Sequence, residues 1–417
     1  NIFKKHRIVK EREQEENKML QGKTVLLGVT GGIAAYKMPN VARMLKKMHC
    51  NVHVLMTQNA TNFITATTFE TLTGNKCLID TFDRNFEFSV EHVALAKQAD
   101  LVLLAPATAN VIGKIANGIA DDMLTTTVMA CTCKVLVAPA MNHNMYHNSI
   151  VQENLEKLKR HGYEMIDPVC GMLANGDTGD GKLPSEETLV EYVLRELAFE
   201  KDMQGLKVLV TAGPTQEAID PVRFISNHST GKMGYAIAKN AMLRGAEVTL
   251  VTGRTALEPP MFVKTVPVTS AKDMYQAVME CAKEQDIIVK AAAVADYTPA
   301  HTADEKIKKS EGELSLALEK TTDILAELGK NKGNTVLCGF SMETEHMLEN
   351  SRAKRKKKNL DMIAANNLKQ QGAGFAGDTN VLTLITEDWE KELALMSKDE
   401  AAKCLLDELL KIKKNKK

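Results

Sequence analysis

Two rhythms of apolar residues alternate along this chain. Short, almost uninterrupted apolar runs end in Gly, Thr, Asn or Asp and are typical of strands that are buried on both faces. The segments between them repeat their apolar residues every three to four positions, which is typical of amphipathic helices. In the first half the strand-like runs are residues 23–29, 52–56, 101–105 and 135–138, and helical patterns cover 33–47 and 148–161. This order predicts a parallel sheet with helices on both faces.

A second series begins after a looser, Gly- and Asp-rich stretch at 167–184 and a helical pattern near 185–200. Its strand-like runs are residues 207–211, 247–252, 286–292, 335–340 and 361–365, and its helical patterns are residues 232–244, 271–283, 322–330 and 345–358. The repeated alternation predicts a second, Rossmann-like parallel sheet. The expected fold class is therefore α/β with two three-layer units, the first flavodoxin-like or Rossmann-like and the second Rossmann-like.

These patterns divide the chain into two domains with short flanking segments. The expected ranges are a disordered leader at 1–18, a first domain at 19–190, a linker at 191–205, a second domain at 206–395, and a C-terminal helix with a basic tail at 396–417. The leader is highly charged and has no apolar period, so it plays no part in the expected fold. The last helix opens with Ser397 and Glu400 at the spacing of a capping box.

Composition narrows the range of partners. Lys and Arg together number 53, as do Asp and Glu, so no net charge draws the chain to nucleic acid or to a membrane. No apolar run reaches the roughly 18 residues that a membrane span needs, and no signal peptide is visible. The eight cysteines are scattered, and Cys131 and Cys133 lack the second pair that zinc sites usually have, so no metal ligands are predicted. Free thiols agree with a cytoplasmic location.

Polar loops follow three neighbouring strands of the first predicted sheet. A turn containing Gly31 and Gly32 joins the first strand to a helix, while Thr57 and residues 105–110 lie at the ends of two further strands. Glycines let the backbone approach a phosphate, and the start of a helix supplies N–H donors. The turn lacks the spaced glycines of a dinucleotide-binding motif, and a tight packing turn would look the same. Together the three loops predict a site for one phosphorylated cofactor.

Three segments of the first half carry a resemblance to a known family. Residues 28–37, 105–121 and 139–146 resemble the flavin-dependent decarboxylases that act on phosphopantothenoylcysteine, and the likeness extends over roughly residues 19–190. The resemblance implies FMN as the cofactor. The residues it places at the flavin are Gly31, Gly32, Thr57, Ala107, Thr108 and Asn110.

The chemistry of that family explains these side-chain types. A carboxylate beside a thiol-bearing carbon has no electron sink until the flavin oxidises the thiol to a thioaldehyde, after which carbon dioxide can leave. The resemblance implies that His92 is the base, that Asn142 clamps the substrate carboxylate, and that Met145 contacts the substrate. Without the family, a single histidine on a helix would more simply be a surface or core residue.

One position departs from the decarboxylase family. The family has Ala-Cys-Gly in a flap over the site, where the cysteine takes part in reducing the enethiol intermediate, and this chain has Asn175 at that position. An amide cannot donate a proton of similar acidity. Either another group protonates the intermediate, or the reduction is impaired and the oxidised enethiol accumulates. Cys170 could substitute only if the flap folds differently.

The second half resembles the phosphopantothenate–cysteine ligases over about 150 residues. The matching segments are residues 211–215, 220–234, 291–297, 306–309, 339–340 and 358–361. The bacterial members of that family use CTP, and the order of decarboxylase then ligase is that of the bacterial bifunctional enzymes. The resemblance therefore implies CTP as co-substrate, an acyl-cytidylate intermediate, and Mg²⁺ to neutralise phosphate charge.

The roles of individual residues in this half also follow from the resemblance. Asn227 is expected to hold the acyl-cytidylate while the amine attacks, and Lys306 to act at the nucleotide. Lys354 and Lys358 are four residues apart on a predicted helix, so both can face the phosphates. Read alone, residues 352–358 would be a solvated helix face or a weak nucleic-acid patch. The remaining expected residues are Asp296, Thr322, Asp323, Ile324, Leu325 and Phe340 at the nucleotide, and Arg223 and Ala292 at the substrate.

Three interpretations are open at this point. The first is a bifunctional enzyme of coenzyme A biosynthesis that joins phosphopantothenate to cysteine and decarboxylates the product. The second is a ligase fused to an impaired or regulatory flavin-binding domain, because of Asn175. The third, an NAD(P) dehydrogenase, lacks the spaced glycines and the acidic residue that should follow them. The first implies small-molecule partners, no nucleic acid or membrane, and a homo-oligomer with trimeric decarboxylase and dimeric ligase contacts.

Overall fold

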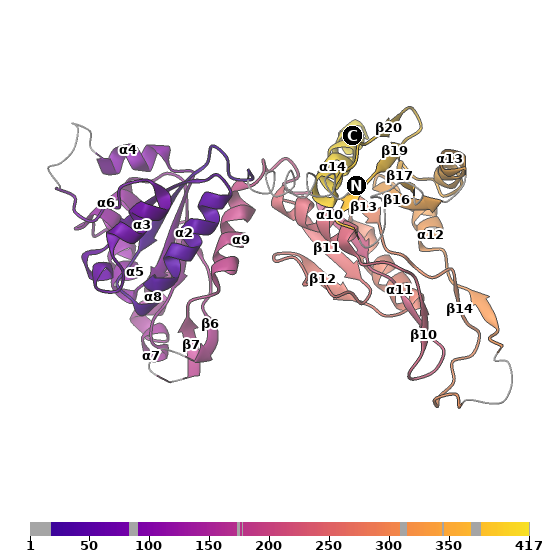
Figure 1. Cartoon of the computed structure of the whole chain (residues 1–417), viewed down its shortest axis with the longest axis horizontal. Coiled ribbons are helices and arrows are strands. Elements are labelled where there is room, and N and C mark those ends of the chain that lie inside the picture. Colours follow the sequence, from indigo (N-terminus) through magenta and orange to yellow (C-terminus); the bar gives the residue numbers. More distant parts are fainter. Residues whose placement is uncertain are drawn as a thin grey trace. The chain divides into compact units, whose positions relative to one another are not determined.

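The chain divides into two compact units, residues 1–199 and residues 200–417 (Figure 1). The structure is a computed structural model, and it describes residues 18–82, 91–172, 176, 178–308, 315–343, 346–367 and 377–416. The expected leader at 1–18 and the position Asn175 therefore fall almost wholly outside the described residues. None of the described helices is both long enough and apolar enough to cross a lipid bilayer.

The first unit is built on a parallel sheet with the strand order β2-β1-β3-β4-β5. Its strands are β1 (Thr24–Val29), β2 (Asn51–Met56), β3 (Leu101–Ala107), β4 (Lys134–Pro139) and β5 (Glu164–Met165). The order is that of flavodoxin-like sheets, in which ligands bind where the chain switches direction between β1 and β3. The flavodoxin-like expectation is confirmed, and the short strand β5 is an addition that its two residues were too few to predict.

Helices follow most of the expected patterns in this unit. They are η1 (Ile33–Lys37), α2 (Met38–Lys47), η2 (Gln58–Asn62), α3 (Ala66–Thr73), α4 (Glu91–Gln98), α5 (Ala109–Ala116), α6 (Met123–Ala130), α7 (His143–Tyr146), α8 (Ser149–Arg160) and α9 (Glu186–Leu197). The continuous helix expected over 33–47 is wrong in its first turn, which is 3₁₀. Pro39 lies at the start of the α-helical part, where its missing N–H costs nothing.

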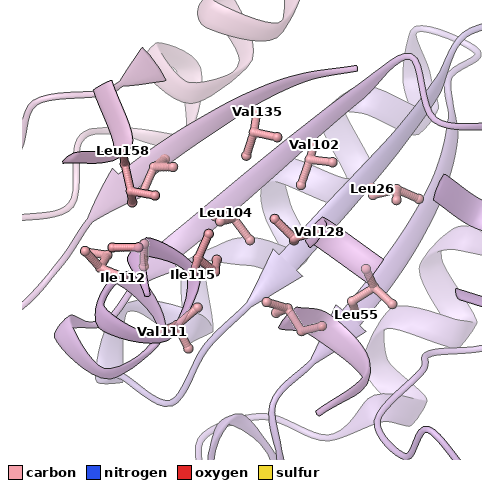
Figure 2. Packing of buried hydrophobic residues seen from close by; sticks show 14 of the residues in the cluster. Leu26, Leu55, Val102, Leu104, Val111, Ile112, Ile115, Val128, Val135 and Leu158 are labelled. Carbon is pink, nitrogen blue, oxygen red and sulfur yellow. The ribbon is translucent and has the colours of Figure 1, made fainter. Parts of the chain in front are cut away.

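The core of the first unit lies between the sheet and α4, α5, α6 and α8. Leu26, Val102 and Leu104 project from the strands toward Ile112 of α5 and Val128 of α6 (Figure 2). All five side chains are at most 1% exposed. Burying one such side chain is worth about 1.5–3 kcal/mol, so this layer fixes the strand ends from which the first site is built. Helix α9 packs on α2 and continues to residue 197, into the range expected to be a linker.

The second unit has an eight-stranded sheet with the order β12-β11-β8-β13-β16-β17-β19-β20. Its strands are β8 (Lys207–Ala212), β11 (Glu247–Thr252), β12 (Lys264–Pro267), β13 (Ile287–Lys290), β16 (Val336–Glu343), β17 (Met362–Asn367), β19 (Leu382–Ile385) and β20 (Glu390–Glu392). The strands from β12 to β17 are parallel, whereas β19 and β20 add an antiparallel edge. The Rossmann-like core is confirmed, and the sheet is mixed rather than wholly parallel.

Helices and short ribbons complete the second unit. The helices are α10 (Lys232–Leu243), α11 (Ala271–Cys281), η3 (Ala282–Glu284), α12 (Ile324–Lys330), α13 (Met347–Lys357) and α14 (Lys398–Asn415). The ribbons pair β9 (Gln216–Ala218) with β10 (Phe224–Ser226), β14 (Tyr297–Pro299) with β15 (Leu318–Lys320), and β18 (Thr379–Asn380) with β21 (Met396–Ser397). The predicted capping box at Ser397 and Glu400 is present, and α14 packs against α10 (Figure 1). The C-terminal helix is therefore part of the folded unit.

Candidate active sites

Two loops of the first unit are tied together where β1 and β3 end. The hydroxyl of Thr30 is fully buried, donates to the carbonyl of Pro106 at 2.6 Å, and accepts from the N–H of Thr108 at 3.0 Å. Beside them, a Cβ on Gly31 would lie 2.5 Å from Cβ of Asn59, so only glycine allows this close approach. The sequence thus builds a narrow, rigid backbone cradle at the switch point of the sheet.

A cavity of about 640 Å³ opens at this edge. It brings together the predicted residues Gly31, Gly32, Thr108, Asn142 and Met145. Its far wall comes from a hairpin, β6 (Val169–Met172) and β7 (Thr178–Lys182), which supplies Met172, Gly181 and Lys182. Of the other predicted residues, Thr57, Ala107, Asn110 and His92 do not line this cavity within the described part of the chain.

The chemistry of the cradle fits a bound flavin. Thr57 is buried, its N–H donates to the carbonyl of Val29, and its hydroxyl has no hydrogen-bond partner within the described residues. A buried hydroxyl without a partner costs about 1–3 kcal/mol, so a ligand that accepts its proton would relieve that cost. The side chains of Ile33 and Tyr36 at the cavity are 55% and 61% exposed, and offer apolar surface to a planar ring.

Asn142 is held at the start of α7 with part of its amide still available. Its Oδ1 accepts from the N–H of Asn144 at 2.9 Å, which caps the short helix. The preceding N–H of Met141 donates to the carbonyl of Gly181 at 3.0 Å, and a Cβ on Gly181 would overlap the carbonyl of Met141. The hairpin and the loop that carries Asn142 therefore meet backbone to backbone, with Asn142 facing the cavity.

Two predicted catalytic residues are not tested by this geometry. His92 is half-buried on α4 and does not line the cavity within the described residues. Asn175 lies outside the described residues, as do its neighbours 173, 174 and 177. The roles of both residues remain predictions.

A second cavity, of about 560 Å³, lies toward the carboxyl ends of β13, β16 and β17 in the second unit. The structure brings together at this cavity ten of the predicted residues, namely Asn227, Ala292, Asp296, Thr322, Asp323, Ile324, Leu325, Phe340, Lys354 and Lys358. They come from segments more than 130 positions apart in the sequence, so the sheet assembles the site. Arg223 and Lys306 do not line the cavity within the described residues.

Threonine hydroxyls lock the loops that form the floor of this cavity. Oγ1 of Thr211 accepts from the N–H of Ala292 at 3.1 Å, and Oγ1 of Thr215 accepts from the N–H of Ala295 at 3.0 Å. Nδ2 of Asn227 donates to the carbonyl of Ala293 at 3.2 Å. These bonds join segments about 65 to 80 residues apart, so Asn227 sits on a fixed wall with the rest of its amide toward the cavity.

Basic side chains gather on one side of the second cavity. Lys354 and Lys358 both extend from the last turns of α13, as their spacing predicted. Nζ of Lys358 pairs with Oδ2 of Asp323 at 2.7 Å, and Nζ of Lys354 donates to the carbonyl of Phe340 at 3.2 Å. Burial opposes ionisation of Asp323, but Lys358 and the N–H of Ala326 outweigh it and lower the pKa of this carboxyl group.

Lys290 is a cavity residue that the sequence patterns did not identify. It is the last residue of β13, the strand between β8 and β16, and it lines the same cavity as Lys354 and Lys358. Burial, together with the ammonium groups of Lys354 and Lys358, lowers the pKa of Lys290 to about 8. Its ammonium group has no hydrogen bond or ion pair to any described residue. A lysine at the end of an otherwise apolar strand could have indicated this site. The strand was expected to extend to residue 292, so Lys290 was not recognised as its last residue.

Arg223, which was expected at the substrate, makes contacts that position a loop, and its substrate role stays a prediction. Its guanidinium group donates to the buried carboxylate of Asp220 and, at 2.7 Å, to the carbonyl of Ile307. The N–H groups of Val222, Arg223 and Ile307 also donate to Asp220. Burial opposes its ionisation, but these donors hold the pKa of Asp220 well below its usual range. Arg223 and Asp220 thereby fix the loop that carries Lys306, which is exposed here.

Comparison with known proteins agrees with this two-unit arrangement. Two family models match the chain, "Flavoprotein" over residues 13–198 and "DNA/pantothenate metabolism flavoprotein C-terminal domain" over residues 203–412. The coenzyme A biosynthesis bifunctional protein CoaBC of Bacillus subtilis (strain 168) is 45% identical over 400 residues, which cover 95% of this chain and 98% of that protein. The CoaBC proteins of Haemophilus influenzae (strain Rd) and Escherichia coli (strain K12) are each 42% identical, over 94% of this chain and 98% and 97% of theirs.

A crystal structure of the C-terminal domain of a CoaBC protein is also similar, with 41% sequence identity and a TM-score of 0.46. It covers 52% of this chain and all of that domain. Each of these relatives is a single chain whose similarity extends over both units of this protein. The chain therefore belongs to the family of bifunctional CoaBC proteins of coenzyme A biosynthesis.

Proposed function

We propose that the chain converts 4'-phosphopantothenate to 4'-phosphopantetheine in two steps of coenzyme A biosynthesis. The second unit joins phosphopantothenate to cysteine with CTP, and the first unit decarboxylates the product with FMN. The observation that carries the proposal is the content of the two cavities. One is a glycine cradle beside the buried hydroxyl of Thr57, which has no partner among the described residues, and the other is lined, within the described residues, by five lysines, two aspartates and Asn227.

In the ligase step, the carboxylate of phosphopantothenate attacks the α-phosphate of CTP and pyrophosphate leaves. Lys290, Lys354 and Lys358 line this cavity and would neutralise the charge of the phosphates. The amine of cysteine then attacks the acyl carbon, an amide forms, and CMP and a proton leave. The neutral amide of Asn227 holds the acyl-cytidylate during this attack, and Phe340 and Asp296 contact the base. Mg²⁺ is expected to bind with the triphosphate.

In the decarboxylase step, FMN supplies the two-electron oxidation that turns the thiol carbon into an electron sink. Gly31, Gly32, Thr57 and Thr108 would hold it, with Ala107 and Asn110 on the same loop. Asn142 orients the substrate carboxylate from the start of α7, and Met145 packs beside it. We expect His92 to take the thiol proton. The two electrons return to the enethiol together with two protons, so the net reaction consumes one proton and releases carbon dioxide.

Mass spectrometry of the products tests both steps together. The purified chain is supplied with phosphopantothenate, cysteine, CTP and Mg²⁺, and we expect CMP, pyrophosphate, carbon dioxide and 4'-phosphopantetheine. Absence of cysteine-dependent CMP would contradict the ligase assignment, and accumulation of phosphopantothenoylcysteine would contradict the decarboxylase assignment. Accumulation of the oxidised enethiol would show that Asn175 impairs the reduction, and Asn175→Cys should then restore the saturated thiol.

The two other interpretations have less support. A flavin-binding regulatory protein is not favoured, because the relatives that match over about 95% of the chain are bifunctional biosynthetic enzymes. A dehydrogenase finds no support in either family model. We further propose a homo-oligomer with trimeric contacts between first units and paired second units. Light scattering coupled to size-exclusion chromatography tests it, since a monomer at micromolar concentration would contradict it.

A further inference from the structure

Two histidines and an aspartate meet beside the first cavity, in a group to which neither reaction assigns a role. His143 opens α7 and His147 follows its last residue, so the two rings are four positions apart on one side of the turn. Their ring centroids are 4.4 Å apart. Nε2 of His147 lies 3.2 Å from Oδ2 of Asp180 on β7. One ligand atom from each of the three residues lies within 4.8 Å of the other two.

This spacing is close to that of a metal site. Ligand atoms that lie about 2.0–2.1 Å from a tetrahedral zinc ion are about 3.3 Å apart, near the separation of His147 and Asp180. Two imidazoles and one carboxylate form a donor set typical of Zn²⁺ and similar ions, whereas Mg²⁺ and Ca²⁺ prefer oxygen alone. The side chains of His147 and Asp180 are 50% and 45% exposed, so an ion can enter and keep a water ligand.

The third member of the group is held in place by the hairpin. Nδ1 of His143 accepts from the N–H of Asp180 at 3.2 Å, which holds the ring against β7, and an ion bound at this nitrogen would take the place of that hydrogen bond. A Cβ on Gly179 would lie 2.8 Å from the same Nδ1, so the close approach depends on glycine at that position. The geometry of the group is therefore set by backbone contacts as well as by the side chains themselves.

We propose that His143, His147 and Asp180 bind a divalent ion of the zinc class, which ties the β6–β7 hairpin to α7. Two of the ligands belong to the helix that starts after Asn142, and the third belongs to the strand that supplies Gly181 and Lys182 to the cavity. A shared ion between them fixes the distance between these two walls. Binding of the ion does not depend on turnover. Only its effect on the walls of the active site rests on the proposed decarboxylase function.

Metal titration of the full-length chain tests the site directly. Tag-free protein is treated with a chelator, then titrated with Co²⁺ and Zn²⁺ in excess Mg²⁺, with calorimetry and visible Co²⁺ absorption as readouts. We expect one ion per chain, and at least about tenfold weaker binding in His147→Ala and in Asp180→Asn. The matched control is His161→Ala, because His161 is exposed at the end of α8 and outside the group. Binding that is not stoichiometric, or that survives both substitutions, overturns the proposal.

A second readout tests the tie between the hairpin and α7. Lys182 is exposed at the end of β7, so trypsin can cleave after it. We expect Zn²⁺ to slow this cleavage severalfold in the native chain and to leave its rate unchanged in Asp180→Asn. Cleavage that Zn²⁺ does not slow in the native chain overturns the tie. Neither readout uses the enzymatic reaction, so loss of decarboxylation alone would contradict the proposed function and leave this site standing.

Discussion

Each of the two cavities lies at the carboxyl ends of parallel strands, but the two cavities are lined by different kinds of residue. The first is lined by glycines and by exposed apolar side chains on a hairpin and a short helix. The second is shaped by charge, with Lys290, Lys354 and Lys358 facing the same space as Asp296 and Asp323. A planar cofactor that stays bound needs shape, whereas a triphosphate that enters and leaves at each turnover needs fixed cations. In the proposed function, loops on similar sheets therefore provide for two kinds of ligand.

The largest effect is expected at Asn227. Asn227→Asp removes the donor to the carbonyl of Ala293 and adds a negative charge beside the expected acyl-phosphate. We expect the coupling of cysteine to fall about 10²–10³-fold, while pyrophosphate release in the first turnover persists and decarboxylation of added phosphopantothenoylcysteine is unchanged. Rapid-quench measurement of pyrophosphate and CMP separates the steps. Asn334→Asp, at an exposed turn of the same unit, is the control. Unchanged coupling would refute the role of Asn227.

The counterpart in the first cavity is Asn142→Asp. The new carboxylate can still accept from the N–H of Asn144, so α7 stays capped, but it repels the substrate carboxylate. We expect decarboxylation to fall on the order of 100-fold, with ligation unaffected. Asn148→Asp is a closely matched control, because Asn148 caps α8 in the same way through the N–H of Ile150. Equal losses in the two variants would mean that an added charge near α7, and not a substrate contact of residue 142, explains the effect.

Lys290→Met should have opposite effects on ligation and on stability. Removing a cation from the phosphate side of the cavity should lower kcat/KM for CTP by about tenfold. Lys320→Met, on the exposed strand β15, should leave ligation unchanged. Undiminished kcat/KM in Lys290→Met would exclude this lysine from the nucleotide site.

The effect of Lys290→Met on stability depends on pH. The pKa of Lys290 is lowered from 10.5 to about 8 in the folded chain. Below pH 8 the residue is charged in the folded chain, and the full cost of burying that charge lowers the free energy of unfolding. Between these values the unfolded chain binds more protons, and the stability contributed by this residue rises with pH. Without CTP, the variant should therefore melt at a higher temperature at pH 7, and its advantage should shrink from pH 8 toward 10.5. An advantage that grows with pH would contradict the assignment.

The smallest expected effect is at Thr57. Thr57→Val keeps the shape of the side chain and removes the buried hydroxyl that has no partner among the described residues. We expect FMN to bind about tenfold more weakly, because one hydrogen bond is lost, while the apo form is at least as stable as the native chain. The comparison is Thr127→Val on α6, whose hydroxyl donates to the carbonyl of Met123 at 2.7 Å. That variant should lose stability and bind FMN normally, as measured by flavin fluorescence quenching. Normal FMN affinity in Thr57→Val would remove this residue from the flavin site.

The sequence predicted correctly those helices and strands whose own residues carry a clear apolar pattern. The run at 207–211 is strand β8, and the helix expected at 271–283 is α11, whose start is marked by the capping box of Ser270 and Asp273. The antiparallel edge was not predicted, because β20 consists of three exposed charged residues, Glu390 to Glu392, with no apolar alternation. The pairing that turns this segment into a strand comes from β19, and it is invisible before the fold is formed.

The same limit applies to the sites. Lys354 and Lys358 could be placed together because helical spacing links them, and the structure confirms this. Arg223 was expected at the substrate, but its partners include Ile307, 84 positions away, and no local pattern announces that contact. Lys290 was overlooked for a related reason, since the end of a strand depends on where its neighbours β8 and β16 stop. His143 and His147 are visible as a pair in sequence, whereas Asp180 joins them only through the hairpin.

The hydrogen bonds to the carboxylate of Asp220 predict how this position should respond to substitution. Its two oxygens accept from the backbone of Val222, Arg223 and Ile307 and from the side chain of Arg223, although it lies outside the cavity. Any replacement leaves several N–H donors without an acceptor, and even glutamate places its carboxylate oxygens one methylene group too far away. In a saturation-mutagenesis screen this position should therefore tolerate as few amino acids as Asn227. Intolerance to substitution alone would mark Asp220 as a reacting group, when what it does is hold a loop still.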